Sequence, residues 1–222
     1  MDRALIVIDV QESFRQQPNW AAISDPGIVA AVNRLLALAR ADGDLVVWVL
    51  HAEAGSGDAF DPASGHVRPI DGLVPREGEP TVTKTSHNAF TTTNLQQVLT
   101  MNGVRELVIC GIRTEQCCET TARVGSDFGY DVTFVLDATA TSPIEHPDAQ
   151  PGRSVVEILA DPATLSTGDI LDRTRYVLAG RFATVTTVAA LVAERAAART
   201  TATADLSGAA SAVPVPTPVA GS

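Results

Sequence analysis

Short apolar runs alternate along this chain with longer segments whose apolar residues recur at helical spacing. The first run, residues 4–8, reads Ala-Leu-Ile-Val-Ile, and further apolar or β-branched runs occupy residues 45–50, 81–83, 106–110, 131–136 and 183–186. Helical periodicity is seen in residues 28–40, 93–101, 153–160, 170–178 and 188–198. This alternation predicts an α/β three-layer sandwich, with a mostly parallel six-stranded sheet and helices on both faces, because parallel strands are joined by helical crossovers.

Length and composition predict one folded domain followed by a tail. The 222 residues are 45% hydrophobic and 19% charged, which is ordinary for a globular protein. From residue 199 the composition changes to Ala, Thr, Ser, Gly and Pro with almost no charge, and such a segment cannot bury a core. We expect a domain over residues 1–198 and a low-complexity, disordered tail over 199–222. Residues 51–80 are expected to form a long functional loop.

Charge and cysteine usage argue against several classes of function. The formal net charge of −10 does not suit a nucleic-acid partner, which needs a basic face. No apolar run reaches the ~20 residues that span a bilayer, and no signal-peptide pattern precedes the first strand. The three cysteines fall within nine positions, and their odd number is typical of reduced thiols. We therefore expect a cytoplasmic protein without membrane or nucleic-acid partners.

Polar residues stand at the carboxyl ends of three predicted strands. Asp9 and Lys84 directly follow the first and third runs, and Cys117 lies in the first turn of a helix after the fourth. The carboxyl ends of parallel strands share one edge of the sheet, where ligands bind, so these side chains should converge. An acid or base, a cation and a thiol at one edge are typical of an activated-nucleophile site.

The start of the helix after the fourth strand favours a reactive thiol. Gly111 is expected to end the strand, and Thr114 to cap a helix that begins at Glu115. Cys117 then lies among N–H groups without intrahelical partners, at the positive end of the helix dipole, a setting that favours thiolate. Cys118 is turned by about 100° from Cys117, so only one of the two can face a cleft.

Three motifs resemble those of the isochorismatase-like cysteine hydrolases: Asp9-Val-Gln11, Lys84-Thr-Ser-His-Asn-Ala-Phe90, and Gly111-Ile-Arg-Thr-Glu-Gln-Cys117 followed by Thr121-Ala122. The resemblance covers roughly residues 4 to 190. It implies a homo-oligomeric cysteine amidohydrolase that cleaves the C–N bond of a small amide or ureido substrate through a thioester intermediate.

The resemblance also implies a role for each motif residue. Cys117 would be the nucleophile and Asp9 the general base and acid, while Lys84 would stabilise the thiolate. The spacing from Gly111 in the family selects Cys117, which leaves Cys118 to packing.

By the same resemblance, backbone N–H groups of Arg113 and Cys117 would hold the oxyanion, beside a cis peptide bond at Ile112–Arg113. Arg113 departs from the small residues common at this position in relatives. Its side chain could point away, or contact a neighbouring subunit or an anionic substrate group.

Four further side chains near the predicted edge are candidates for substrate binding, although each also suits a core or wall position: Gln11, Phe14, Trp48 and Phe90. We expect no metal and no other cofactor, because residues 51–66 contain His, Asp and Glu without the Asp-x-His pair that some nicotinamidase-type relatives carry. The expected topology is Rossmann-like, but no Gly-x-Gly-x-x-Gly follows the first strand, which argues against dinucleotide binding.

Alternatives remain at this stage. Asp9 and Lys84 could form a purely structural ion pair, Cys117 could be a small core residue, and His87 could replace Asp9 as base. A vinyl ether hydrolase of the isochorismatase type would need the acid and the lysine but no thiol. A non-catalytic scaffold would need none of the three.

Overall fold

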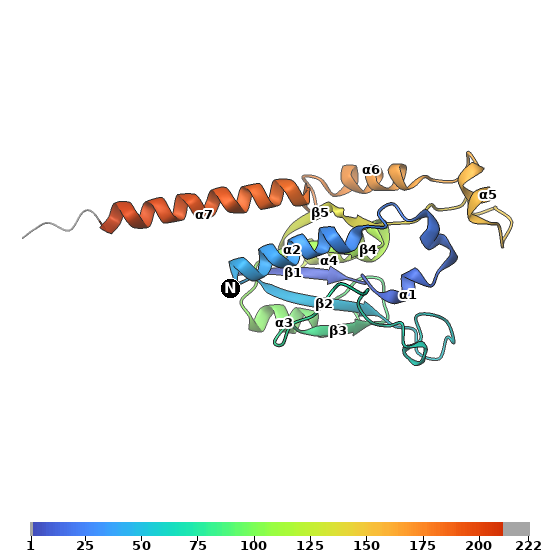
Figure 1. Cartoon of the computed structure of the whole chain (residues 1–222), viewed down its shortest axis with the longest axis horizontal. Helices are drawn as coiled ribbons and strands as arrows, with labels where there is room; N and C mark the ends of the chain where they lie inside the picture. The colour runs from blue at the N-terminus through green and yellow to red at the C-terminus, as the bar shows by residue number, and fades with distance from the viewer. Residues whose placement is uncertain (1, 211–222) are drawn as a thin grey trace, which may run out of the picture. The chain divides into compact units, whose positions relative to one another are not determined.

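Six parallel strands form the centre of the fold, in the spatial order β3-β2-β1-β4-β5-β6 (Figure 1). The computed structural model describes residues 2–210. The strands are β1 (Arg3–Ile8), β2 (Leu45–His51), β3 (Thr81–Lys84), β4 (Glu106–Ile112), β5 (Asp131–Ala140) and β6 (Thr184–Thr186). All five pairings are parallel, which confirms the predicted sheet and its number of strands.

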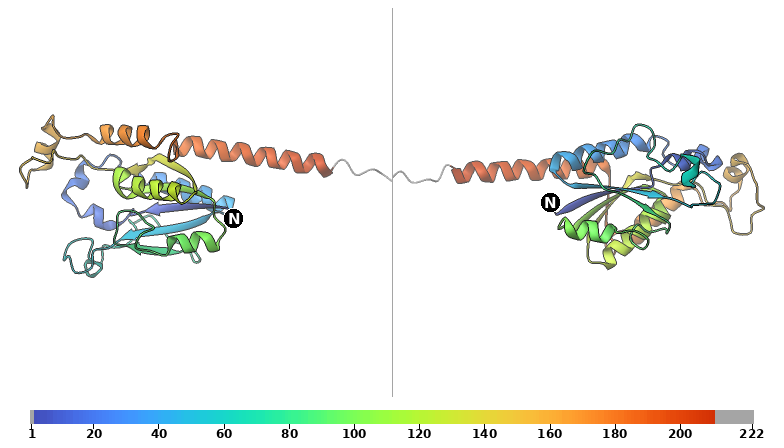
Figure 2. Two further views of the ribbon diagram at one scale, coloured as in Figure 1. Left: turned by 180° about the vertical axis from the view of Figure 1, so that it is seen from behind. Right: turned by 90° about the horizontal axis from the view of Figure 1, so that it is seen from below.

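Helices cover both faces of the sheet, so the predicted three-layer sandwich is confirmed (Figure 2). Helix α2 covers one face, while α3, α4 and α6 cover the other. The helices before the last strand are α1 (Glu12–Arg15), α2 (Ile28–Asp42), α3 (Leu95–Met101), α4 (Glu119–Asp127), α5 (Val155–Ala160) and α6 (Thr167–Leu178). Shorter turns are η1 (Pro18–Ala22), η2 (Pro62–Ser64) and η3 (Thr114–Cys118).

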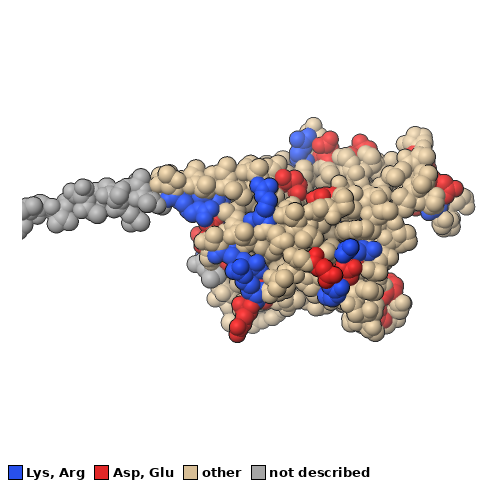
Figure 3. All heavy atoms as spheres, in the orientation of Figure 1, with Lys and Arg blue, Asp and Glu red and all other residues tan. Residues whose placement is uncertain are grey.

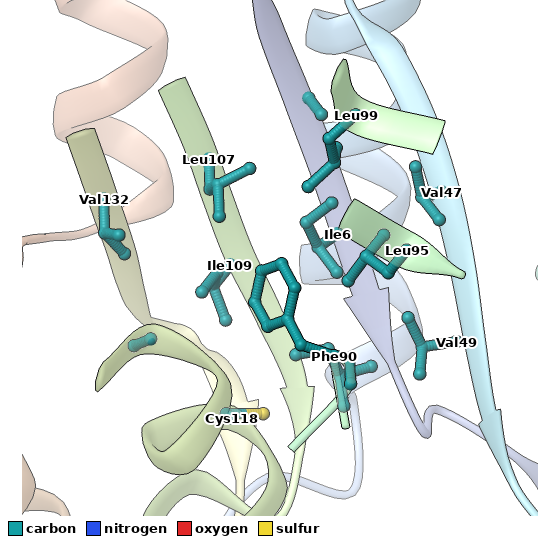
Figure 4. Close-up of a cluster of buried hydrophobic side chains, with 14 of the residues drawn as sticks. Ile6, Val47, Val49, Phe90, Leu95, Leu99, Leu107, Ile109, Cys118 and Val132 are labelled. Atoms are coloured by element: carbon teal, nitrogen blue, oxygen red, sulfur yellow. The ribbon is translucent and has the colours of Figure 1, made fainter. Parts of the chain in front are cut away.

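The core explains why β1 reads as an uninterrupted apolar run. Ile6 of β1 belongs to a cluster with Val47, Ile109 and Leu99 on the α3 and α4 face, which also contains Cys118 (Figure 4). Successive strand residues point to opposite faces, so the intervening residues of β1 are buried on the α2 side. Both faces of β1 are therefore apolar. A polar residue that contributes to a functional site must follow the strand.

The strand order reverses beside β1. The chain builds β2 and β3 on one side of β1 and then returns to place β4 on the other. Loops that leave β1 and β4 therefore diverge at the carboxyl edge and open a crevice, which is where ligands bind in sheets of this kind. Asp9 follows β1, and Cys117 follows β4, so the topology places both at this reversal.

Gly111 does not end β4 as the sequence predicts; the strand continues to Ile112. A register shift against β5 lies between Ile109 and Gly111, and Gly111 has φ +137°. A Cβ atom at this position would lie 1.9 Å from the carbonyl oxygen of Ile8. Only glycine lets β4 approach β1 this closely, at the point where both strands reach the site.

The segment after β4 also differs from the prediction. Residues 114–118 form one wide π-helical turn, and α4 begins only at Glu119. The amide of Cys118 donates to the carbonyl of Arg113 at 3.2 Å, a five-residue span that fits this wide turn. Thr114 does not cap the helix, because its hydroxyl donates to Oγ1 of Thr139 on β5 at 2.9 Å.

The long loop between β2 and β3 is pinned to the segment that follows β1. Gln11 and Pro69 form an isolated antiparallel bridge, and the amides of Glu12 and Ser13 donate to the carbonyls of Arg68 and His66 at 2.9 and 3.1 Å. This backbone pairing holds the loop beside the carboxyl edge of the sheet.

Residues 189–210 belong to a separate unit, which contains most of helix α7 (Val188–Ala210). The helix continues past Ala198 to Ala210, into the segment for which the sequence predicts a disordered tail, and residues 211–222 of that segment lie outside the described part. Within the described part of the chain, no helix is both long and apolar enough to cross a membrane.

On the face shown in Figure 3, basic and acidic side chains are interspersed.

Candidate active site

The three predicted catalytic side chains meet at the floor of a cavity. The ammonium nitrogen (Nζ) of Lys84 lies 2.7 Å from Oδ2 of Asp9 and 3.3 Å from Sγ of Cys117. Asp9 and Lys84 are fully buried, and Cys117 is 7% exposed. Residues from three distant parts of the chain are thus brought into direct contact, as the convergence at the carboxyl edge predicts.

The backbone at each position fixes this geometry. Asp9 has the left-handed φ of +52°, and its amide donates to the carbonyl of Val49 at 2.8 Å. Lys84 is the last residue of β3, while Cys117 lies in the wide turn η3. The hydroxyl of Thr121 donates to the carbonyl of Cys117 at 2.6 Å and accepts from the amide of Ala89 at 3.0 Å. These two bonds link the turn that contains Cys117 to the loop that follows Lys84.

Burial and charge set the protonation of the pair. Burial raises the pKa of Asp9, and the attraction of Lys84 offsets this rise only in part. Burial alone would lower the pKa of Lys84, but the negative charge of Asp9 and the contacts of the ammonium with Asp9 and Cys117 outweigh this effect, so the pKa of Lys84 is raised. Lys84 is therefore a firmly protonated cation next to a carboxylate of raised basicity.

The thiol is not ionised at rest. Burial and the neighbouring Asp9 raise the pKa of Cys117 to about 12, and Lys84 opposes this only in part. The sequence predicts a thiolate from the helix end, whereas the surroundings of the sulfur favour the neutral thiol. The correction has a physical reason: the desolvation of a buried sulfur and an adjacent carboxylate exceed the effect of the helix end. Activation therefore requires a base.

His51 adds a second connection to Lys84. Nδ1 of His51 lies 3.4 Å from Nζ of Lys84, which also donates to the carbonyl of Ser86 at 3.1 Å. Nε2 of His51 lies 3.0 Å from Oε1 of Glu53. His51 is the last residue of β2 and therefore lies at the same edge of the sheet as Asp9 and Lys84. This position could have identified His51 from the sequence as a candidate site residue.

A cavity of about 330 Å³ opens above the three residues, a size that suits a small molecule. It is lined by Asp9, Phe14, Gln17, His51, Glu53, Phe60, Thr85, His87, Arg113, Gln116 and Cys117. Phe14 is therefore placed where the sequence predicts a substrate-binding side chain. His87 also lines the cavity, but the groups around the Cys117 sulfur are Lys84 and Asp9. The Ile112–Arg113 peptide bond is cis, as the resemblance implies.

Gln11, Trp48 and Phe90 do not line this cavity, which corrects the sequence-based prediction. The fully buried side-chain amide of Gln11 donates to the carbonyl of His51 at 2.9 Å and accepts from its amide at 2.7 Å. Gln11 therefore holds the chain after β1 against the end of β2. Nε1 of Trp48 donates to Oε2 of Glu79 at 2.8 Å, and Phe90 packs in the core (Figure 4).

Substitution of Trp48 by phenylalanine tests this correction. The change removes the indole N–H and leaves the Glu79 carboxylate with one donor fewer, so we expect the free energy of unfolding to fall by about 1–3 kcal/mol. KM should stay at the wild-type value, because Trp48 does not line the cavity. Denaturant unfolding and steady-state kinetics measure the two quantities; a several-fold rise in KM would return Trp48 to the substrate site.

Among the residues that the structure describes, no group of three or more His, Cys, Asp or Glu side chains is arranged to hold a metal ion. The side chains of His51 and Glu53 contact each other and both line the cavity. This part of the site therefore contains two side chains of the kinds that bind metal ions.

A parallel three-layer α/β fold brings a buried acid, amine and thiol together at its topological reversal. The family model described as the isochorismatase domain matches residues 3–161, and the chain belongs to the isochorismatase family.

Individual relatives agree with this assignment. The chain is 37% identical to streptothricin hydrolase of Streptomyces noursei over 68% of its own length and 58% of that protein. It is 27% identical to ureidoacrylate amidohydrolase RutB of Klebsiella pneumoniae over 61% of its own length and 72% of that protein. The crystal structure of a cysteine hydrolase from Pseudomonas syringae superimposes with a TM-score of 0.72 at 26% identity, covering 88% of this chain and 93% of that one.

Proposed function

We propose that this chain is a cysteine-dependent amidohydrolase that cleaves the C–N bond of a small amide or ureido compound through a thioester. The observation that carries the proposal is the contact of Lys84 with both Asp9 and Cys117, at 2.7 and 3.3 Å. Relatives named as a streptothricin hydrolase, a ureidoacrylate amidohydrolase and a cysteine hydrolase support it.

In the first half of the reaction, Asp9 takes the proton of the Cys117 thiol while Cys117 attacks the carbonyl carbon of the amide. The raised pKa of Asp9 makes the carboxylate a better base, and Lys84 stabilises the negative charge on sulfur. The new S–C bond converts the carbonyl into an oxyanion, which the N–H groups of Arg113 and Cys117 would hold. The C–N bond then breaks as Asp9 returns its proton to the nitrogen.

In the second half, water replaces the departed amine or ammonia. Asp9, again a carboxylate, takes a proton from this water as its oxygen attacks the thioester carbon. The C–S bond breaks, the carboxylic acid product leaves, and the sulfur recovers a proton from Asp9. Lys84 remains protonated throughout, because its pKa is raised.

The alternatives use fewer of the observed contacts. Vinyl ether hydrolysis needs the acid and the lysine, but it gives no reason for a thiol within hydrogen-bond distance of the ammonium. A scaffold gives no reason to bury an ion pair beneath a cavity, where the desolvation of both charges is costly.

The proposal is tested by ammonia release from a panel of small primary amides, ureido acids and nicotinamide, with wild-type protein and Cys117→Ala. Turnover of any member by the wild type alone supports a cysteine amidohydrolase. Equal turnover by both proteins, or no turnover of any member by the wild type, would contradict the proposal.

The pH dependence should report the raised pKa of Asp9. As the pH falls through this pKa, Asp9 becomes protonated and can no longer accept the thiol proton, so kcat/KM is lost on the acid side. We expect this acid limb at higher pH than the ordinary value of about 3.9 for aspartate. Lys84→Met should shift the limb further upward, because Lys84 lowers the pKa of Asp9. An acid limb at the ordinary value in wild type would argue against Asp9 as base.

A further inference from the structure

A second cavity, of about 260 Å³, adjoins the one that contains Cys117. Arg113 and Gln116 line both cavities, so they stand at the junction. The second cavity lies where α5 packs against η1, and the loop after β5 completes its wall. A ligand that extends from Cys117 past these two side chains would enter the second cavity.

The walls of the second cavity are mainly apolar. Five of its lining residues have aliphatic or small side chains: Ala22, Pro143, Ile144, Val155 and Ile158. The one acidic lining residue, Glu145, already accepts a hydrogen bond from Nε of Arg153 at 2.6 Å, so its charge is compensated. This wall chemistry suits a hydrocarbon arm rather than a charged or strongly polar one.

The junction itself carries a cation that is available to a ligand. The guanidinium of Arg113 lies 5.8 Å from the ring centroid of Phe14, a cation–π contact that restrains it without using its N–H donors. Among the described residues, no carboxylate lies within ion-pair distance of Arg113. A guanidinium with free donors at such a junction is suited to bidentate recognition of a carboxylate.

We propose that the preferred substrates are amides that carry a carboxylate and an apolar arm on the same side of the C–N bond, as N-acyl amino acids do. The amide would lie at Cys117, the carboxylate at Arg113 and the arm between η1 and α5. This inference rests on the proposed amide hydrolysis, in which water and such an amide give a carboxylic acid and the free amino acid. Arg113 and the second cavity would then determine specificity.

Binding to the Cys117→Ala protein tests the inference independently of catalysis. Four compounds separate the two features: N-acetylphenylalanine, N-acetylglycine without the arm, N-(2-phenylethyl)acetamide without the carboxylate, and N-ethylacetamide with neither. Calorimetry should show that each feature tightens binding by about tenfold or more, because a buried aromatic arm and a charge-assisted pair both contribute at that level. Equal affinity for all four compounds, or no binding, would overturn the inference.

Variants in the Cys117→Ala background assign each feature to its residues. Ala22→Phe, which fills the second cavity, should lower the preference for the arm about tenfold and leave the preference for the carboxylate. Ile158→Trp fills it from the α5 side, in case the first variant does not fold. Val156→Phe is the matched control, because Val156 is on α5 but 76% exposed. Arg113→Gln should remove only the preference for the carboxylate.

The outcomes separate this inference from the proposed function. If Ala22→Phe and Val156→Phe have the same effect, the second cavity does not bind the arm. If small amides are hydrolysed by the wild type but the four compounds bind equally, amide hydrolysis stands and the specificity inference fails. If the compounds bind as expected and no amide is turned over, the subsite stands and the proposed function fails.

Discussion

Cys117→Ala is expected to lower kcat/KM for the best amide of the panel by about ten-thousandfold or more, while the protein remains folded. Removal of the nucleophile from a catalytic triad costs on this order, since no other group in the site can form the covalent intermediate. The side chain is small and borders the cavity, so its loss should change stability little. Steady-state kinetics and circular dichroism measure the two effects.

Cys118→Ala is the matched control. Cys118 is fully buried and belongs to the hydrophobic core on the α3 and α4 face (Figure 4). Its truncation leaves a small cavity that should cost about 1 kcal/mol of unfolding free energy, whereas kcat/KM should stay within a few-fold of wild type. Equal loss of activity in both variants would contradict the assignment of Cys117 as the nucleophile.

Asp9→Asn is expected to abolish activity and also to destabilise the protein by about 3–5 kcal/mol. Asparagine cannot accept the thiol proton, and it leaves the fully buried ammonium of Lys84 without its counter-ion. Lys84→Met should be destabilising for the complementary reason, but less so, since the pKa of Asp9 is already raised and this carboxyl can become neutral.

The double variant Asp9→Asn/Lys84→Met separates stability from catalysis. Because it removes both charges together, we expect a loss of unfolding free energy well below the sum of the two single losses. Its activity should not return, because the base is still absent. Additive losses of stability would mean that the two residues do not interact as the 2.7 Å contact indicates.

The sheet and the three converging residues could be predicted from the sequence because they depend on local patterns. Ala4–Ile8 is apolar throughout because β1 is covered on both faces, and Asp9 directly follows it. Parallel pairing then fixes which edge the polar residue reaches, without knowledge of any side-chain contact.

The errors arise where distant contacts override the local pattern. Gly111 is conspicuous as a strand breaker, yet its role is to admit the carbonyl of Ile8. Thr114 has the chemistry of a helix cap, but Thr139 on β5 takes its hydroxyl. Trp48 is a candidate for substrate binding from its place near the sheet edge, and its indole instead donates to Glu79. None of these partners is close in sequence.

The protonation of Cys117 could not be predicted for a similar reason. A helix end is visible in a sequence, whereas the burial of the sulfur and its distance from Asp9 and Lys84 are properties of the folded chain. These properties raise the pKa of the thiol and make the base necessary, which is why Asp9 has the central place in the proposed mechanism.

The most direct test of the proposed chemistry is to trap the intermediate. Wild-type protein mixed with a substrate from the amide panel, quenched in acid within milliseconds and digested, should give the peptide that contains Cys117 with the mass of the acyl group added. Fragmentation should place that group on Cys117 and not on Cys118. Product formation in the same samples without any acyl group on Cys117 would contradict a thioester mechanism.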